Sequence, residues 1–333
     1  MKNIPIFFTF NNDYTVPAAA AFYSLLNKAK DDVFYEMFVL HSDISGENQE
    51  LLKNIVSAKQ NGKLEFINTN GFLENEWKLG NFEGHQNKNQ FTTETILKCF
   101  GAKFFPQYDK IIYSDVDIVV MDDISELFDV DLENNYIAAV RGAFNKYSPD
   151  ELSHFKPEHY ELLKDSYFAG GIWVMNLKKI REDNLEQRMI EIVKDDSIIK
   201  RWPDQDIINI ACNNQVAFVP LNYISYPYLL DLLQKDNFTS HYSREEMFDS
   251  IINPKIIHYA GNKPWHNNAK KAEIWWEIFY YLNLPKTSIF KEIEPSRIEK
   301  KYKKYKKLFN KLLIFSIAML AIMFVALITV WVK

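Results

Sequence analysis

The chain has 333 residues, a formal net charge of −5, and 47% hydrophobic and 15% aromatic residues. This composition excludes a disordered chain, and two cysteines without metal-ligand spacing, Cys99 and Cys212, exclude a disulfide framework. Because basic residues are concentrated between Arg297 and Lys311, the rest of the chain is strongly acidic, which argues against nucleic-acid binding.

The amino-terminal part of the chain alternates patterns typical of strands and helices. The apolar run at 4–10 predicts a buried strand, followed by a polar turn at 11–14 and by a helix that Pro17 opens. The same pattern continues with strands at 35–40 and 64–67 and helices at 47–59 and 92–105. This alternation predicts an α/β fold with a mostly parallel central sheet. The polar segment 71–90 is too long for a simple connector and is interpreted as a flap over a site.

A predicted buried strand at 110–114 ends in two acidic residues, Asp115 and Asp117. Carboxylates at this spacing suit Mg²⁺ or Mn²⁺ bound to a nucleotide diphosphate. The Asp-x-Asp spacing occurs twice more and so does not select a site by itself: Asp129/Asp131 and Asp204/Asp206. Only the first pair follows a buried strand whose carboxyl end would open into the ligand crevice of an α/β sheet. A metal site and a solvated strand end both fit this context.

Two glycines mark the start of a later apolar segment. A short strand is predicted at 136–140, and the segment 167–177 begins with a glycine turn that contains Gly170 and Gly171 and leads into an apolar strand. Paired glycines allow the backbone to approach a ligand or a neighbouring strand closely. A tight turn with nothing bound explains the pair equally well.

Acidic residues open a helix in the next segment. A charged helix is predicted at 185–194, and Asp204, Gln205 and Asp206 then begin an apolar helix that continues through 207–211. Aspartates at a helix start are explained by ordinary capping unless other information points to a ligand.

A histidine and a lysine lie five residues apart near the end of the acidic part of the chain. His258 ends a short apolar strand, Gly261 forms a turn, and Lys263 follows it. A single histidine is usually structural. Here the imidazole offers a nitrogen ligand for a metal ion and the ammonium group offers a partner for phosphate oxygens.

The carboxyl-terminal region predicts a membrane anchor. Residues 312–332 are apolar except for Ser316 and Thr329, and a helix of this length spans about 30 Å of hydrocarbon. The polybasic segment 297–311 precedes it and should remain on the cytoplasmic side. We therefore expect a single-pass transmembrane helix that holds the protein at the cytoplasmic face of the inner (cell) membrane.

Five segments, taken in order, resemble the retaining glycosyltransferases of family 8, which include bacterial lipopolysaccharide glucosyl- and galactosyltransferases and glycogenin. These segments are FFTFNNDY, YDKIIYSDVDIVV, YFAGGIWVMNLKKIR, PDQDIIN and IIHYAGNKPW. The resemblance implies a GT-A (Rossmann-like) catalytic domain at 1–265 that uses a UDP-sugar and Mn²⁺ or Mg²⁺. A helical extension at 266–296 would then lead to the polybasic segment and the transmembrane helix.

The resemblance also implies roles for individual residues. It assigns the metal to Asp115, Asp117 and His258, and the diphosphate to Gly261 and Lys263. The uracil and ribose would be bound by Thr9, Asn11, Asp13 and Tyr14. The nucleotide sugar would be contacted by Lys98, Val116, Gly170 and Gly171. Asp204 would bind the sugar hydroxyls, and Gln205 would lie beneath the anomeric carbon. Two positions depart from the family pattern, Ala169 and Gly142, and both bear on the identity of the hexose.

The implied activity is transfer of glucose or galactose from a UDP-hexose to a hydroxyl of a glycan or lipid-linked glycan, in lipopolysaccharide or other surface-glycan assembly. Lys263, Asp204 and Gln205 are the expected catalytic residues. Attack on the face that UDP leaves is favoured, because an amide is a poor nucleophile, while Asp204 or Asp206 as a covalent nucleophile stays open. Two alternatives are a catalytically silent, membrane-tethered sugar-nucleotide-binding protein and a nucleotidyltransferase. A nucleotidyltransferase would normally have a glycine-rich, basic phosphate loop after its first strand. The turn at that place, residues 11–14, is not such a loop.

Overall fold

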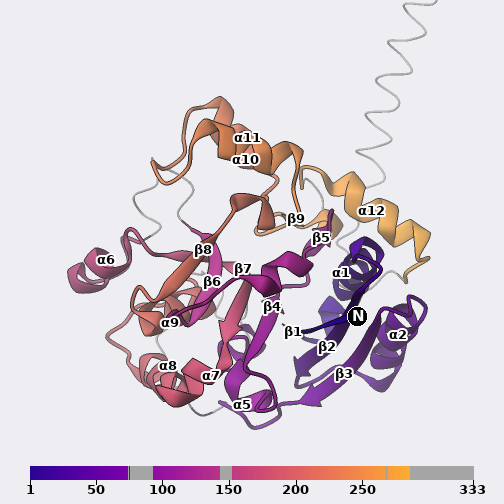
Figure 1. Cartoon of the computed structure of the whole chain (residues 1–333), viewed down its shortest axis with the longest axis horizontal. Helices are drawn as coiled ribbons and strands as arrows, with labels where there is room; N and C mark the ends of the chain where they lie inside the picture. The colour runs from indigo at the N-terminus through magenta and orange to yellow at the C-terminus, as the bar shows by residue number, and fades with distance from the viewer. Residues whose placement is uncertain (74, 76–92, 143–151, 267–268, 286–333) are drawn as a thin grey trace, which may run out of the picture. The chain divides into compact units, whose positions relative to one another are not determined.

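A computed structural model of the chain describes residues 1–73, 75, 93–142, 152–266 and 269–285 (Figure 1). The chain divides into two compact units. The first consists of Met1–Pro264 and Asn268–Ile289, and it contains every strand described below. The second consists of Trp265–Asn267 and Phe290–Lys333, and most of it lies outside the described residues.

The centre of the first unit is a seven-stranded sheet in the order β3-β2-β1-β4-β7-β6-β8. Neighbouring strands pair in parallel except where β7 meets β4 and β6, so only β7 runs against the others. The predicted mostly parallel sheet is therefore confirmed. The strands are β1 (Lys2–Thr9), β2 (Val33–His41), β3 (Gly62–Asn68), β4 (Lys110–Ser114), β6 (Ile137–Arg141), β7 (Phe168–Asn176) and β8 (Val216–Val219).

A second, two-stranded sheet joins β5 (Ile118–Val120) to β9 (Ile256–His258). The two strands are antiparallel, and Ile118 pairs with His258. Because β5 begins just after Asp117 and β9 ends at His258, this pairing brings together side chains that are 141 residues apart in the sequence.

Helices flank the sheets, with α2 beside β3, α1 beside β5 and α9 beside β7 (Figure 1). The α-helices are α1 (Thr15–Lys28), α2 (Gly46–Ser57), α4 (Thr93–Leu97), α5 (Gly101–Phe104), α6 (Pro157–Leu163), α7 (Leu177–Glu182), α8 (Leu185–Lys194), α9 (Pro203–Cys212), α10 (Leu229–Gln234), α11 (Arg244–Ile252) and α12 (Ala272–Tyr281). Short 3-10 helices are η1 (Asn12–Tyr14), η2 (Ser125–Asp129), η4 (Leu221–Tyr223) and η5 (Pro264–His266).

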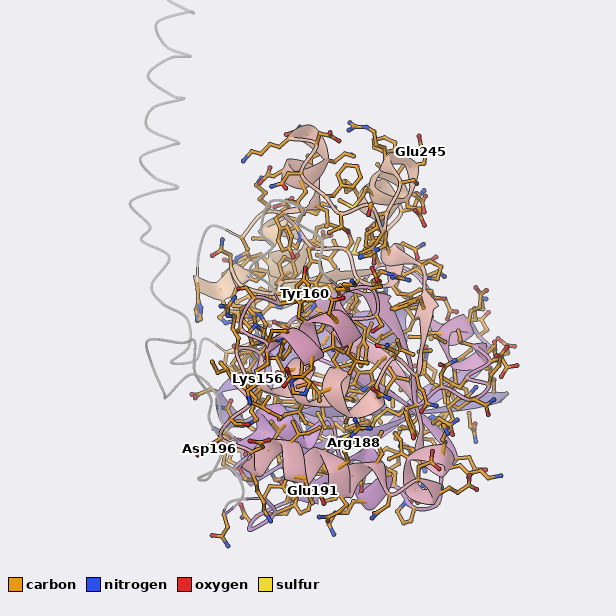
Figure 2. The ribbon with its side chains drawn as sticks, turned by 90° about the vertical axis from the view of Figure 1, so that its left-hand side faces the viewer. Lys156, Tyr160, Arg188, Glu191, Asp196 and Glu245 are labelled. Carbon is orange, nitrogen blue, oxygen red and sulfur yellow. The ribbon has the colours of Figure 1, made fainter. Side chains whose placement is uncertain are left out.

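The helix α8 illustrates how amphipathic helices cover the core. Its charged residues Arg188 and Glu191 point to the outside (Figure 2), whereas Met189, Ile192 and Val193 are buried. This spacing of three and four residues is the period of a helix with one apolar face. The sequence predicted the bounds of α8, 185–194, because the period is regular over its whole length.

Two predicted elements differ from the structure. The single helix expected at 92–105 is divided into α4 and α5, with Lys98 in the connection between them. There the backbone forms tight turns, and the buried Lys98 side chain is directed to the carboxylate cluster described below. The expected glycine turn is also wrong, because Gly170 and Gly171 lie inside β7. The proposed flap at 71–90 falls largely outside the described residues.

The expected membrane anchor is corrected. Among the residues that the structure describes, no helix is long and apolar enough to cross a bilayer. The longest of them, α1, has 14 residues, which at about 1.5 Å per residue is too short for about 30 Å of hydrocarbon. The segment 312–332 itself lies outside the described residues. The α/β fold class is confirmed, whereas the predicted transmembrane helix and the location at the membrane face receive no support from the residues that the structure describes. The helix α12 lies within 266–296, while the domain bounds stay predictions.

Candidate functional site

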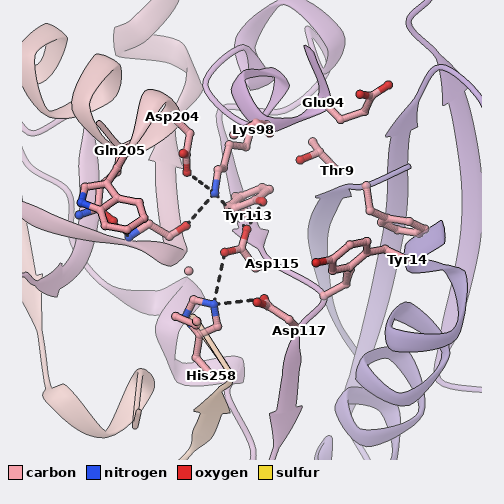
Figure 3. Close-up of a pocket in the computed structure, with 18 of the residues that line it drawn as sticks. Thr9, Tyr14, Glu94, Lys98, Tyr113, Asp115, Asp117, Asp204, Gln205 and His258 are labelled. Carbon is pink, nitrogen blue, oxygen red and sulfur yellow. Dashed lines mark hydrogen bonds and ion pairs between the residues drawn. The ribbon is translucent and has the colours of Figure 1, made fainter. Parts of the chain in front are cut away.

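The carboxyl ends of the central strands open into a cavity of about 350 Å³ (Figure 3). Parallel strands release their following residues at one edge of a sheet, which is why segments distant in sequence meet there. The lining comes from the ends of β1, β4 and β9, the start of β7, and the helices α4 and α9. It comprises Thr9, Phe10, Asn11, Tyr14, Glu94, Thr95, Lys98, Tyr113, Asp115, Val116, Asp117, Gly170, Gly171, Trp202, Asp204, Gln205, Tyr226, His258, Ala260, Gly261 and Lys263.

Two carboxylates and an imidazole converge in the middle of this cavity. The Nε2 atom of His258 lies 3.1 Å from Oδ1 of Asp117 and 3.5 Å from Oδ2 of Asp115. One potential ligand atom from each of the three residues lies within 4.8 Å of the others. Oxygen and nitrogen atoms at this separation can coordinate one divalent cation. The structure thus brings together the three residues that the resemblance assigned to the metal.

Asp117 is held between two basic side chains. It forms an ion pair with Lys263, whose Nζ atom also donates a hydrogen bond of 3.0 Å to the carbonyl oxygen of Tyr259. Burial opposes ionisation of Asp117, but Lys263 and His258 outweigh it and lower the pKa of this carboxyl well below its usual value. Burial likewise disfavours the charged form of Lys263, and Asp117 reverses this and raises the pKa of the ammonium group. Asp117 is therefore an anion, ready to bind a cation.

Lys98 joins the carboxylate cluster to the residues of α9. Its side chain is 7% exposed, and its Nζ atom lies 3.0 Å from Oδ1 of Asp115 and forms an ion pair with Asp204. It also donates a hydrogen bond of 3.2 Å to the carbonyl oxygen of Gly170. Burial lowers the pKa of Lys98, but the two carboxylates raise it well above its usual value. A buried cation thus connects an expected metal ligand with an expected sugar ligand.

The electrostatic state of Asp115 differs from that of Asp117. Burial raises the pKa of Asp115, and the negative charge of Asp117 raises it further, while Lys98 and His258 oppose both effects. The net direction is upward. A divalent cation between the two carboxylates would remove their mutual repulsion, so the pair is suited to such an ion.

The two glycines of β7 allow this packing. A Cβ atom on Gly171 would overlap the ring of His258, and one on Gly170 would lie 3.0 Å from Oε1 of Gln205. The backbone N–H of Gly170 donates a hydrogen bond of 2.9 Å to that same oxygen. Close approach, rather than a turn, is therefore the reason for both glycines.

Asp204 and Asp206, at the start of α9, point in different directions. Asp204 and Gln205 line the cavity, whereas Asp206 is fully buried and is not part of the wall. Asp206 accepts hydrogen bonds from the Tyr167 hydroxyl at 2.6 Å and from the Trp202 N–H at 3.0 Å, and it lies 2.9 Å from Nε2 of His154. Asp206 therefore has a structural role at the start of α9, whereas Asp204 and Gln205 face the cavity.

The opposite end of the cavity is lined by residues at and after the end of β1 and by residues of α4. Thr9, Asn11 and Tyr14 line it as predicted, but Asp13 is exposed and does not belong to the wall. The Oδ1 atom of Asn11 is buried and has no hydrogen-bond partner among the described residues. Buried polar atoms are usually paired, so this oxygen is suited to a donor group on a ligand.

Comparison with known proteins assigns the chain to a family. The family model described as glycosyl transferase family 8 matches residues 5–269. The chain belongs to this family. It therefore is an enzyme that transfers sugars, and the family resemblance of its five segments is confirmed.

Individual members of family 8 show the same relationship. The chain is 27% identical to a putative glycosyltransferase of Haemophilus influenzae, over 80% of this chain and 74% of that protein. It is 25% identical to a lipopolysaccharide 1,2-glucosyltransferase of Escherichia coli, over 90% of this chain and 83% of that protein. Among solved structures, the bifunctional enzyme WbbM gives a TM-score of 0.70 at 27% identity, over 90% of this chain and 51% of that one. The galactosyltransferase LgtC, in complex with donor and acceptor sugar analogs, gives a TM-score of 0.66 at 21% identity, over 85% of this chain and 98% of that one. This similarity shows that the two proteins share a fold.

Several cavity residues of this family 8 member were not predicted. They are Phe10, Glu94, Thr95, Tyr113, Trp202, Tyr226 and Ala260. One signal was available for Glu94, since it precedes Lys98 by four residues and such a pair lies on one helix face. No comparable signal marks Tyr113, which lies inside a strand, or Tyr226, which reaches the cavity only through the tertiary fold.

Proposed function

We propose that this enzyme transfers glucose or galactose from a UDP-hexose to a hydroxyl group of a surface glycan, with retention of configuration. One observation carries the proposal: the cluster of Asp115, Asp117 and His258 and the sugar-side residue Asp204 share one cavity and are linked through Lys98. A nucleotide diphosphate needs a cation beside it, and a hexose needs hydrogen-bonding groups at the next position. The cavity offers both in that order.

The relatives support the choice of hexose and acceptor. One is named a lipopolysaccharide 1,2-glucosyltransferase from Escherichia coli, and another a lipopolysaccharide 1,3-galactosyltransferase from Salmonella typhimurium, which is 30% identical over 53% of this chain and 50% of that protein. We therefore place the acceptor among lipopolysaccharide or similar glycans, free or lipid-linked. The two names leave glucose and galactose as equal candidates.

The proposed cofactor is Mn²⁺, with Mg²⁺ as the alternative, bound by Asp115, Asp117 and His258. The donor set fits, because carboxylate oxygens suit both ions and an imidazole nitrogen favours Mn²⁺. When bound, the ion supplies positive charge beside the diphosphate. Chelation should abolish UDP release, and added Mn²⁺ should restore it better than Mg²⁺. Turnover that persists in excess chelator would contradict the metal assignment.

Lys263 is proposed to stabilise the leaving UDP. Its ammonium group lies in the wall beside Asp117, where charge would increase on the diphosphate as the glycosidic bond breaks. A fixed cation in a largely buried site stabilises such charge by several kcal/mol without reorganisation. Val116 and Gly261 line the same part of the cavity and would contact the donor.

For the retaining step we propose attack on the face that UDP leaves. Asp206 is an unsuitable nucleophile because it is buried outside the wall and saturated by Tyr167 and Trp202. Asp204 is engaged by Lys98, which suits it for hydrogen bonds to sugar hydroxyls. The Gln205 amide is a poor nucleophile and is fixed by Gly170, so it is proposed to lie beneath the anomeric carbon.

A panel of UDP-sugars tests the proposal. The purified full chain is incubated with Mn²⁺ and each sugar, and UDP release is measured. We expect release above background with UDP-glucose or UDP-galactose and, with an acceptor, an α-linked product by NMR. A protein that binds UDP-sugar but releases no UDP under any condition would instead be a silent binding partner.

A further inference from the structure

A buried carboxylate at the nucleoside end of the cavity has no role in the mechanism above. Glu94, on α4, is 5% exposed and lines the cavity wall. One of its oxygens accepts a hydrogen bond from the Ser42 hydroxyl, which follows β2 directly. Within the described residues Ser42 is its only hydrogen-bond partner, and the second carboxylate oxygen forms none. Such a group can only accept hydrogen bonds, so it is complementary to a donor.

The sheet order shows which part of a nucleotide would reach this carboxylate. Asp115 follows β4, Asn11 lies two residues after β1, and Ser42 follows β2, and these strands are parallel neighbours in the order β2-β1-β4. Their carboxyl ends therefore form one row. The carboxyl ends of β4 and β2 are separated by two strand spacings, a distance of about 10 Å.

Figure 3 shows the same arrangement across the cavity. Asp204 and Gln205 lie on one side of Asp115, and Thr9 and Glu94 lie on the other. A donor with its hexose near Asp204 and its diphosphate near Asp115 must extend its ribose and then its base toward Thr9 and Glu94. The carboxylate is thus at the base end, while Asn11 is one strand nearer to the diphosphate.

We propose that Glu94 determines base specificity by accepting a hydrogen bond from the imide N3–H of uracil. This inference rests on the proposed use of a UDP-sugar. The N3–H is the only N–H group of uracil in a nucleotide, and a carboxylate that accepts it forms a charge-assisted hydrogen bond. Ser42 positions Glu94 by occupying its other oxygen. Asn11, which lies nearer to the diphosphate, is left for a ribose hydroxyl.

Binding of UDP and of N3-methyl-UDP to the full chain with Mn²⁺, measured by calorimetry, tests this assignment. The wild-type protein should bind UDP at least about tenfold more tightly than the N3-methyl compound. In Glu94→Ala, UDP affinity should fall about tenfold and the preference should nearly disappear. In Glu94→Gln, which has almost the same volume but a neutral acceptor, the preference should fall several-fold.

The controls separate this proposal from others. Glu47→Ala removes an exposed acidic residue of α2 and should bind both compounds as the wild type does. An unchanged preference in Glu94→Gln would mean that the methyl group is excluded by size alone and would overturn the assignment. Loss of discrimination against 2′-deoxy-UDP in Glu94→Ala, with N3 discrimination retained, would place Glu94 at the ribose and also overturn it. If the wild type binds no UDP at all, the proposed function itself fails.

Discussion

The two ends of the cavity differ in how their polar groups are satisfied. On the metal and sugar side, Asp115, Asp117, Asp204, Lys98 and Lys263 are paired with one another before any ligand enters. On the nucleoside side, Asn11 has a buried oxygen without a partner in the described part of the chain, and Glu94 has one partner, Ser42.

This difference separates two kinds of function. Groups that are paired in advance are held in position, and they exchange partners when metal and donor bind, which suits them to stabilise a developing charge. Groups that face the cavity without partners are satisfied only by the ligand. Changes on the first side should therefore alter turnover, and changes on the second side should alter affinity.

The largest expected effect comes from Asp117→Asn. It removes a proposed metal ligand and the partner of Lys263 together, so kcat for UDP release should fall about a thousandfold. The matched control is Asp129→Asn in another Asp-x-Asp pair, where the carboxylate is 63% exposed and binds Lys2 at 2.6 Å. The control should stay within about twofold of the wild type. Comparable losses in both variants would show that the paired side has no special role.

A smaller effect is expected from Gly171→Ala. The added methyl group would overlap the ring of His258 and displace it, so the Mn²⁺ concentration for half-maximal activity should rise about 10- to 100-fold. Gly46→Ala is the control, because nothing lies within 4 Å of its Cβ position. A titration of UDP release with Mn²⁺ measures both. An unchanged Mn²⁺ requirement in Gly171→Ala would remove His258 from the metal site.

Lys263→Ala sharpens the distinction between turnover and affinity. If Lys263 acts on the leaving diphosphate, kcat should fall about tenfold or more while KM for the donor changes less. Lys270→Ala, which removes an exposed lysine that pairs with Asp231, should change neither constant. Steady-state kinetics would contradict this role if only KM rose.

The smallest effect is expected on the nucleoside side. Asn11→Ala removes the buried oxygen that has no hydrogen-bond partner among the described residues, so UDP affinity should fall about three- to tenfold, with little change in kcat at saturating donor. Asp13→Ala serves as the comparison, because this side chain is exposed and outside the wall. Calorimetry with UDP distinguishes them. Equal losses in the two variants would return Asp13 to the binding site, as the sequence analysis expected.

Much of the fold could be predicted from local patterns. The helix at 185–194 and the apolar strand ahead of Asp115 have regular periods, and such periods depend only on which face of an element is buried. The site was predictable where a residue follows a strand of a parallel sheet, as Asp115 does, since those ends share one edge. The division of the expected helix at 92–105 into α4 and α5 was less predictable. It accompanies burial of the Lys98 side chain against Asp115, which is a contact of the tertiary structure and leaves no periodic pattern in the sequence.

By itself the sequence determined the alternation of strands and helices in the amino-terminal part of the chain, the α/β class and the acidic pair at the end of β4, because each follows from short-range periodicity and composition. Only the tertiary structure decided which side chains meet. Pairing of β5 with β9 brings His258 to Asp117 across 141 residues, and packing against β7 requires Gly171. The same long-range contacts turn Asp206 into the core and leave Glu94 facing the nucleoside end. Periodicity states which face of an element is buried, whereas register between distant strands determines what that face contacts.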